Sequence, residues 1–516
     1  MISSRMSTKR SRRRDAPLMT MTGHRNLLTD PLWRAEDLGK PIPDSPDAVS
    51  VALPTWDQVV GYEEGRQEIL DALSCGYPRF CVRPSVQELF DACVDRFGKS
   101  GDVGFAFPSE SVALRCRDFI ARHDDVKAWI EPYGNSGVFG VIVPEGSADT
   151  IKEYWQHSGE IVSSRRARAA LHDTIEDARA PVAEREVREH IASWTGADAT
   201  DVFLYPSGMA ALADSQRMLH ALRPDRKSVQ LGFPYVDLLK LQQKIGPGVY
   251  FFPEIDAESV DDVCKVLESE EICGLFTEFP GNPLLRCPDV EPLGDAIRRN
   301  GGLFVIDETI GSFANVDCLH ACDAVMTSLT KYVSGVGDVI AGSLVLNADS
   351  PQYDAMRSYL ATHFEPLLWG DDAVVLAANA RNYLERMTRI NHNAERLADH
   401  LHDHPAVESV LYPKYAHATA YDQLLKPGGG YGGLLSVVTK DGASTAPGFY
   451  DRLRVSKGPS LGTNYTLACP FTLLAHFNEL DWAESLGVSR WLVRVSVGLE
   501  EPEDLIQRFD EALSGA

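Results

Sequence analysis

The sequence lacks the features that would place it in three large functional classes. No stretch approaches the roughly 18 consecutive apolar residues of a membrane-spanning helix. Positive charge is scarce, because 50 Lys and Arg face 74 Asp and Glu, and the net charge of −24 repels nucleic-acid phosphates. Neither a GxGxxG turn that opens a helix after a strand nor a GxxxxGK[ST] loop is present, which argues against a nucleotide-binding α/β enzyme. We therefore expect a protein that binds neither a membrane nor nucleic acid.

Cysteines are scattered, and none forms a CxxC pair. A chain of 516 residues is long enough to fold without disulfide bonds, so its ten cysteines indicate reduced thiols and a cytoplasmic location. The densest group, Cys318, His320 and Cys322, lacks a fourth ligand and the usual spacing of a metal site. We expect no metal.

The N-terminus differs in charge from the rest of the chain. Residues 1–25 carry seven basic side chains and one acidic side chain, Asp15. This Arg- and Ser-rich composition predicts a basic, disordered tail, which we assign to residues 1–38, and it also permits a mitochondrial targeting sequence.

Beyond residue 160, apolar runs of strand length alternate with segments of helical period, as in VFLY (202–205), GLFTEF (274–279), LFVIDE (303–308) and AVMTSL (324–329). This alternation predicts an α/β fold with a mostly parallel sheet covered on both faces. We assign residues 161–350 to this large domain. Residues 351–516 are expected to form a long helix, from about 371 to 402, and a smaller α+β domain. Residues 39–160 form an N-terminal extension in which no group of residues suggests chemistry.

Two of these strands end in residues that suit one cofactor. Lys331 follows the strand at 324–329, and Asp307 ends the strand at 303–308. An amine and a carboxylate at neighbouring strand ends suit pyridoxal 5'-phosphate: the amine forms a Schiff base, and the carboxylate keeps the pyridine nitrogen protonated. The alternative interpretation is a structural ion pair or two independent surface charges.

A third segment favours phosphate binding. Ser207, Gly208 and Met209 lie between a strand and a helix, where backbone N–H groups and the helix dipole attract an anion. A Ser-Gly helix cap is common by itself, but Ser328 and Thr330 add hydroxyl groups beside Lys331. The combination predicts a phosphate-tethered aldehyde cofactor.

Together these motifs resemble the cystathionine/methionine-metabolism family of pyridoxal-phosphate enzymes, within fold type I. The resemblance covers residues from about 155 to 516 and rests on SSRR (163–166), YPSGMAAL (205–212), EFPGNPLL (278–285), VIDET (305–309), SLTK (328–331) and LVRVSVGLE (492–500). It implies a PLP-dependent transferase with a large α/β domain and a smaller C-terminal α+β domain.

The resemblance implies how the cofactor is held. Lys331 would be the Schiff-base lysine that also shuttles protons, and Asp307 would pair with the pyridinium nitrogen. Tyr235 would stack on the ring, and Asn282 would contact the phenolic oxygen of the cofactor or the substrate carboxylate. The phosphate would be held by Ser207, Gly208, Met209, Ser328 and Thr330.

The resemblance also implies substrate contacts and a shared site. Arg494 would clamp the substrate α-carboxylate as a bidentate fork. Arg165 would reach the phosphate of a neighbouring subunit, in a homodimer or homotetramer with shared active sites. Two positions depart from the pattern of the family. Ser163 replaces a tyrosine that is often credited with helping the leaving group depart. Tyr465 and Thr466 stand where bacterial relatives often carry Glu-Ser, in a loop that lies near the incoming nucleophile in the family, which leaves the second substrate open.

The segments at 39–65 and 76–80 (GYPRF) resemble the extension of fungal-type cystathionine γ-synthases, for which we expect a packing role. This subgroup implies γ-replacement, in which L-cysteine displaces the acyl group of an O-acylated L-homoserine to give cystathionine. The alternatives are sulfide, carbon or nitrogen nucleophiles, a γ-lyase, and a catalytically silent scaffold with the same fold.

Overall fold

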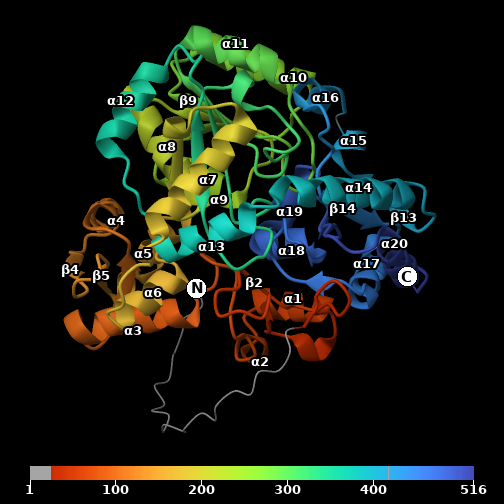
Figure 1. The fold of residues 1–516 in the computed structure, drawn as a ribbon, viewed down its shortest axis with the longest axis horizontal. Helices are drawn as coiled ribbons and strands as arrows, with labels where there is room; N and C mark the ends of the chain where they lie inside the picture. The colour runs from red at the N-terminus through yellow and green to blue at the C-terminus, as the bar shows by residue number, and fades with distance from the viewer. Residues whose placement is uncertain (1–24, 417, 516) are drawn as a thin grey trace.

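The computed structural model describes residues 25–416 and 418–515, so most of the expected basic tail, residues 1–24, lies outside the described residues. The chain forms a large central domain, a C-terminal domain and an N-terminal part that divides in two. Figure 1 shows the central domain between an N-terminal unit around α3–α5 and the C-terminal domain around α14, α17 and α20.

A seven-stranded sheet forms the centre of the large domain. Its order is β6-β12-β11-β10-β9-β7-β8, and all neighbours are parallel except that β12 runs antiparallel to β6 and β11. The predicted mostly parallel sheet is therefore confirmed. Its strands are β6 (Val202–Tyr205), β7 (Ser228–Leu231), β8 (Val249–Phe252), β9 (Gly274–Glu278), β10 (Leu303–Asp307), β11 (Ala324–Thr327) and β12 (Gly342–Leu346).

Helices cover both faces of this sheet, which explains why its strands are apolar throughout. Val325 and Met326, adjacent in β11, are buried in two different cores on opposite faces. One core includes α7 (Ala180–Thr195), α10 (Ala257–Ser269), α11 (Val290–Asn300) and α13 (Gly370–Ala380). The other includes α8 (Gly208–Leu222), α9 (Val236–Lys244) and α12 (Tyr353–His363).

The C-terminal domain is built on a five-stranded sheet of order β13-β14-β17-β16-β15. The single long helix expected at 371–402 is wrong, because the helix breaks at Arg381 and Asn382 into α13, which packs on α7, and α14 (Tyr383–His402), which packs on β13 and α20. The other elements are β13 (Val407–Leu411), α15 (Pro413–Ala416), α16 (Ala418–Leu424), β14 (Leu434–Thr439), α17 (Gly442–Arg452), β15 (Ser456–Lys457), β16 (Leu467–Pro470), α18 (Phe471–His476), α19 (Leu480–Ser485), β17 (Val493–Ser496) and α20 (Pro502–Leu513).

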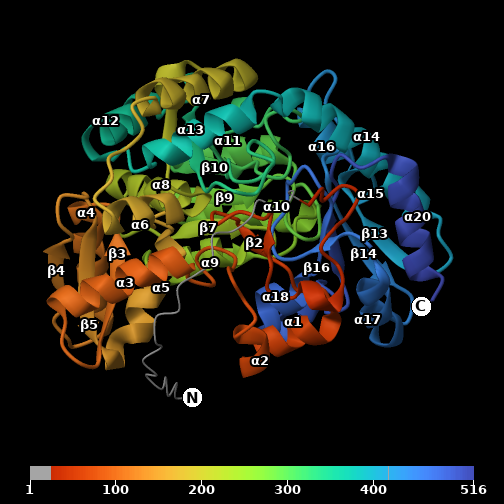
Figure 2. The same cartoon turned by 60° about the horizontal axis from the view of Figure 1, so that its bottom comes forward.

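The first part of the N-terminal extension runs along the C-terminal domain. Trp56, at the start of α1, stacks on Trp491 with ring centroids 5.8 Å apart, and Figure 2 shows α1 beside α18. Leu27 and Leu32 are buried, so residues 25–38 are packed rather than part of the tail to which we assigned them. The elements of this part are β1 (Pro41–Ile42), β2 (Ser50–Val51), α1 (Trp56–Glu63) and α2 (Gln67–Leu70).

The second part of the extension is a separate α/β unit with its own apolar core. An antiparallel sheet of order β3-β5-β4 lies at its centre. Its elements are α3 (Pro84–Phe97), β3 (Asp102–Phe107), α4 (Glu110–His123), β4 (Trp129–Pro132), β5 (Phe139–Pro144) and α5 (Ala148–Ser158), and α6 (Ser164–Leu171) leads into the large domain.

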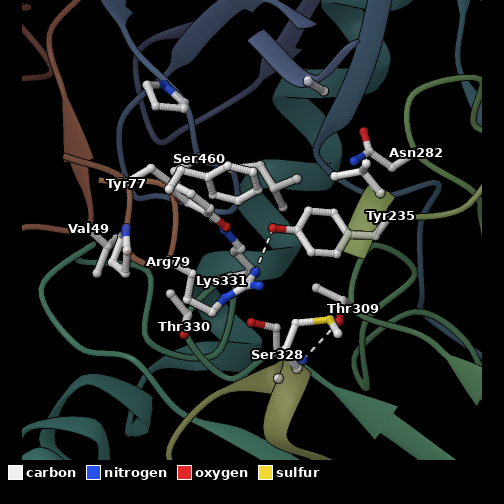
Figure 3. Close-up of a pocket in the computed structure, with 18 of the residues that line it drawn as sticks. Val49, Tyr77, Arg79, Tyr235, Asn282, Thr309, Ser328, Thr330, Lys331 and Ser460 are labelled. Atoms are coloured by element: carbon white, nitrogen blue, oxygen red, sulfur yellow. Dashed lines mark hydrogen bonds between the residues drawn. The ribbon is translucent and has the colours of Figure 1, made fainter. Parts of the chain in front are cut away.

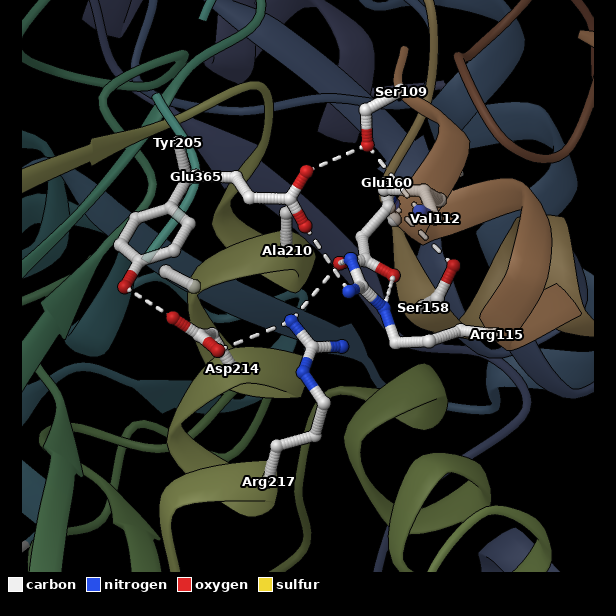
Figure 4. Close-up of polar contacts among 12 residues, drawn as sticks. Ser109, Val112, Arg115, Ser158, Glu160, Tyr205, Ala210, Asp214, Arg217 and Glu365 are labelled. Atoms are coloured by element: carbon white, nitrogen blue, oxygen red, sulfur yellow. Dashed lines mark hydrogen bonds and ion pairs between the residues drawn. The ribbon is translucent and has the colours of Figure 1, made fainter. Parts of the chain in front are cut away.

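A buried charge network joins this unit to α8 (Figure 4). Glu160, 2% exposed, accepts hydrogen bonds from Arg115 Nη2 of α4 at 2.6 Å and from Arg217 Nη2 of α8 at 2.9 Å. Burial raises the pKa of Glu160, but the two arginines outweigh it and hold the pKa below its ordinary value. The network therefore connects the extension to α8, whose first turn lines the candidate active site.

In the described part of the chain, no helix is both long and apolar enough to cross a bilayer. Nor do three His, Cys, Asp or Glu side chains gather there as metal ligands. In the CLHAC segment, His320 pairs with Asp317 at 2.8 Å, and the Cys322 thiol donates to the Cys318 carbonyl oxygen at 3.2 Å.

Candidate active site

A cavity lies at the carboxyl ends of β9, β10 and β11, where the large domain, the C-terminal domain and the extension meet. Parallel strands present their carboxyl ends at one edge, which is where ligands bind in such sheets. The cavity brings together most of the residues predicted from the sequence: Ser207, Gly208, Met209, Tyr235, Asn282, Asp307, Ser328, Thr330, Lys331 and Arg494.

The amine of Lys331 lies inside this cavity. Lys331 follows β11 and is 7% exposed. Its Nζ donates to the Tyr77 hydroxyl at 2.8 Å and to Ser460 Oγ at 3.2 Å (Figure 3). Burial lowers the pKa of the amine, although Tyr77 opposes that shift. A lysine whose proton is bound less tightly is suited to form a Schiff base and to move protons.

Two carboxylates stand side by side at the strand ends. Asp307 of β10 is in register with Glu278 of β9. Burial raises the pKa of Asp307 to about 6, and burial together with the Asp307 charge raises the pKa of Glu278 to about 8. Glu278 accepts hydrogen bonds from the backbone N–H groups of Tyr235 and, at 3.0 Å, Asn282. Glu278 therefore organises two predicted site residues, and we did not single it out from the sequence, although it ends the strand next to Asp307.

The turn from β6 into α8 suits a phosphate group. The first amides of a helix have no partner within it, and Ser207 caps this helix by accepting the Ala210 N–H at 3.0 Å. A Cβ atom on Gly208 would lie 2.9 Å from the Cβ of Ser328, so only glycine allows this close approach. The Ser328 N–H in turn donates to Thr309 Oγ1 at 2.8 Å, and the Thr330 hydroxyl bonds to the backbone of Ala341.

Arg494 supplies a positive charge on the opposite side, from β17. Its guanidinium donates to Asn282 Oδ1 at 3.1 Å and to the Ser460 carbonyl oxygen at 2.9 Å. The residue is 7% exposed, and no carboxylate of the described residues forms an ion pair with it. A buried guanidinium that lacks an anionic partner is suited to bind a substrate carboxylate.

The extension contributes two further residues to the cavity, Tyr77 and Arg79, which we did not single out from the sequence. Tyr77 contacts Lys331, and Arg79 Nη2 donates to the Tyr235 hydroxyl at 2.6 Å. Arg79 also forms a buried ion pair with Asp237 and has a φ of 76°, which is unusual for a residue with a side chain. The only sequence signal was a tyrosine and an arginine in GYPRF, a pattern too common to indicate a site.

Two predicted residues lie outside the cavity of this chain. Arg165 pairs with Asp372 at 2.9 Å and with Asp47 at 3.4 Å. Tyr465 is buried against Leu27 and Ile42. A role for Arg165 at a neighbouring subunit, and a role for Tyr465 near the nucleophile, therefore stay predictions.

Comparisons with known proteins agree with this geometry. Residues 179–514 match the model of the Cys/Met metabolism PLP-dependent enzymes. The chain belongs to this family. Residues 85–163, the α/β unit, match the model of the N-terminal domain of fungal trans-sulfuration enzymes. The family uses pyridoxal 5'-phosphate, and an amine, a strand-end carboxylate and a glycine-lined helix N-terminus in one cavity fit this cofactor.

Individual relatives place the chain near cystathionine γ-synthases. The cystathionine γ-synthase of Neurospora crassa is 34% identical, over 93% of this chain and 98% of that protein. A dechlorinase/desaturase of L-2-amino-4-chloropent-4-enoate from Streptantibioticus cattleyicolor is also 34% identical, over 92% and 98%. Cystathionine γ-synthase from Xanthomonas oryzae pv. oryzae, solved with aminoacrylate and cysteine, superposes with a TM-score of 0.57 at 25% identity, over 64% of this chain and 85% of that one. The protein is thus a PLP-dependent enzyme similar to cystathionine γ-synthases.

Proposed function

We propose that this enzyme replaces the γ-acyl group of an O-acylated L-homoserine with the sulfur of L-cysteine, giving cystathionine. The activity of the Neurospora crassa relative and the cysteine with which the Xanthomonas oryzae enzyme was solved support this choice among the reactions of the family. The observation that carries it is that the guanidinium of Arg494, which forms no ion pair with a described carboxylate, lines the same cavity as the amine of Lys331.

These residues divide the work between binding and proton transfer. When bound, pyridoxal phosphate supplies an electron sink that acidifies the α- and β-hydrogens of an amino acid. Lys331 would take and return those protons at Nζ. Arg494, oriented by Asn282, would hold the α-carboxylate. Asp307 would hold the ring nitrogen of the cofactor, and the first turn of α8 would hold its phosphate.

We also propose that the active site is shared between subunits. Arg165 lies outside the cavity of its own chain, on α6. Its resemblance to the arginine of the family that reaches a neighbouring subunit supports a homodimer or a homotetramer.

A second candidate is a related γ-substitution or elimination in specialised metabolism. The alignment with the Streptantibioticus cattleyicolor enzyme spans 503 positions, whereas the equally identical alignment with the Neurospora crassa enzyme spans 614. Since the two alignments cover nearly the same share of this chain, it fits the Streptantibioticus enzyme with far fewer gaps. This fit in length favours a relative whose substrate carries chlorine on the γ-carbon in place of an acyloxy group.

Product analysis separates these functions. The purified holoenzyme is incubated with O-acetyl- or O-succinylhomoserine, each with L-cysteine, with sulfide or with no nucleophile, and products are measured by mass spectrometry. We expect cystathionine only with cysteine, and none from the Lys331→Ala control. Release of a 2-oxo acid without any nucleophile, with no cystathionine, would identify a lyase or an eliminating enzyme instead.

A further inference from the structure

The extension places a phenol against the amine of Lys331. Tyr77 lies between α2 and α3, and its hydroxyl is 2.8 Å from Lys331 Nζ, which also lies 4.8 Å from the centroid of the Tyr77 ring. A local turn fixes this position, because the Tyr77 carbonyl oxygen accepts the N–H groups of Phe80 and Cys81, and the Phe80 ring packs 5.6 Å from that of Tyr77. Figure 3 shows Tyr77 on one side of Lys331 and Tyr235 on the other.

The charges around this pair favour a shared proton. Tyr77 is half-buried, and its removal from water raises the pKa of the phenol, yet Lys331, Arg79 and Arg494 outweigh this effect and lower the pKa below its ordinary value. Burial lowers the pKa of Lys331, and Arg494 and Arg79 add to that shift. The Asp237 carboxylate partly offsets Arg79, and the other titratable neighbours are Tyr235 beside Tyr77 and Cys469 beside Lys331. The pKa values of the phenol and of the amine are thus both lowered, and each group responds to the charge of the other.

We propose that Tyr77 is the proton-exchange partner of Lys331. The Tyr77 phenolate takes a proton from the Lys331 ammonium: one N–H bond breaks, one O–H bond forms, and a neutral amine remains that can accept a substrate proton. The reverse transfer restores the ammonium, which can donate. This role rests on Lys331 as the proton-moving amine of the proposed function, and it does not depend on which amino acid is the substrate.

The test uses the cofactor-free full-length protein, in which Lys331 is a free amine. Trace acetylation with acetic anhydride is measured at Lys331 by peptide mass spectrometry between pH 6 and pH 11. The midpoint of the rate profile reports the pKa of the amine and, unlike the rate itself, does not depend on access to the cavity. Wild type is compared with Tyr77→Phe and with a matched control, Tyr62→Phe, a cavity-lining tyrosine of the same extension.

Tyr77→Phe keeps the ring and removes only the hydroxyl. Without the phenolate, the ammonium of Lys331 loses its stabilising neighbour, so we expect the midpoint to fall by about one pH unit and the neutral amine to increase about 10-fold below it. Tyr62→Phe should leave the midpoint at the wild-type value. An unchanged midpoint in Tyr77→Phe, or an equal shift in both variants, would overturn the proposal.

A second measurement keeps the proposal testable if Tyr77→Phe folds poorly. Tyrosinate absorbance is titrated in the wild type and in Lys331→Met. We expect one phenolate to form below pH 10 in the wild type and to move to higher pH in Lys331→Met, because the phenol then loses the neighbouring ammonium. The same titration curve in both proteins would overturn the proposal. Neither measurement uses a substrate, so both remain decisive if the enzyme makes no cystathionine.

Discussion

Replacing Arg79 with methionine tests whether the extension is an integral part of the active site. The Arg79 side chain is 8% exposed and that of its partner Asp237 is 0% exposed. Arg79 also donates to the Gln156 carbonyl oxygen at 2.9 Å and to the Tyr235 hydroxyl at 2.6 Å. Methionine fills similar space but leaves the Asp237 carboxylate buried, and among the described side chains His157 and the Gln156 amide remain as its donors.

The expected cost follows from that stranded charge. Removing one partner of a buried ion pair costs about 3–5 kcal/mol. Because two donors to Asp237 remain, we take the lower end of this range, about 3 kcal/mol. For a cooperative unit of 150–250 residues, a loss of this size lowers the melting temperature by roughly 6–12 °C. Thermal unfolding of the cofactor-free protein measures the loss. The double variant Arg79→Met/Asp237→Asn should recover most of it, since it leaves no buried charge.

The pH dependence gives the prediction a definite sign. Burial raises the pKa of Asp237, but Arg79 and His157 outweigh it, so the pKa in the folded protein lies below the ordinary value. The stability from this carboxylate is therefore present above its unfolded pKa of about 3.9 and is lost as the pH falls through the folded pKa. The gap between wild type and Arg79→Met should be full at pH 7 and should shrink below about pH 4. Equal melting temperatures at pH 7, or a double variant no more stable than the single one, would refute the reasoning.

Three further predictions concern the residues identified from the sequence. Lys331→Ala should abolish turnover and the visible absorbance of lysine-bound cofactor, because no other described cavity-lining residue carries a primary amine; absorbance that borohydride still fixes to the protein would contradict this. Asp307→Asn should keep the cofactor but lower kcat about 100–1,000-fold, or about 3–4 kcal/mol, and near-normal turnover would show that Asp307 acts elsewhere. Arg165→Ala subunits are mixed with Lys331→Ala subunits, after each variant is shown to be folded and inactive alone. If sites are shared, the mixture should regain about a quarter of wild-type activity, and no recovery after proven subunit exchange would exclude sharing.

Some parts of the site could be predicted from the sequence, because their chemistry is local to a strand end. Asp307 ends β10, Lys331 follows β11, and Gly208 opens α8 after β6. In a parallel sheet the carboxyl ends of the strands lie at one edge, so the order of strands alone predicts that residues far apart in the chain become neighbours there. Glu278 obeys the same rule at the end of β9, and a stricter search of strand ends would have found it.

Other parts could not be predicted in this way. The extension has no periodic pattern that shows where residues 76–80 will lie, because their position depends on α1 packing against α17 and α18 and on the ion pair of Arg79 with Asp237. The break between α13 and α14 was missed because both halves are amphipathic and no proline marks the boundary.

The amino-acid sequence by itself predicted the class of fold, the cofactor and a set of candidate residues to bind it, since alternating strands and helices fix which strand ends share an edge. Only the tertiary structure decided what surrounds the reacting amine. Tyr77 and Lys331 are separated by 254 positions in the chain, and their contact of 2.8 Å exists because the extension folds back onto the cavity. The proton affinity of a buried amine depends on such neighbours, and long-range packing, which no local pattern encodes, selects them.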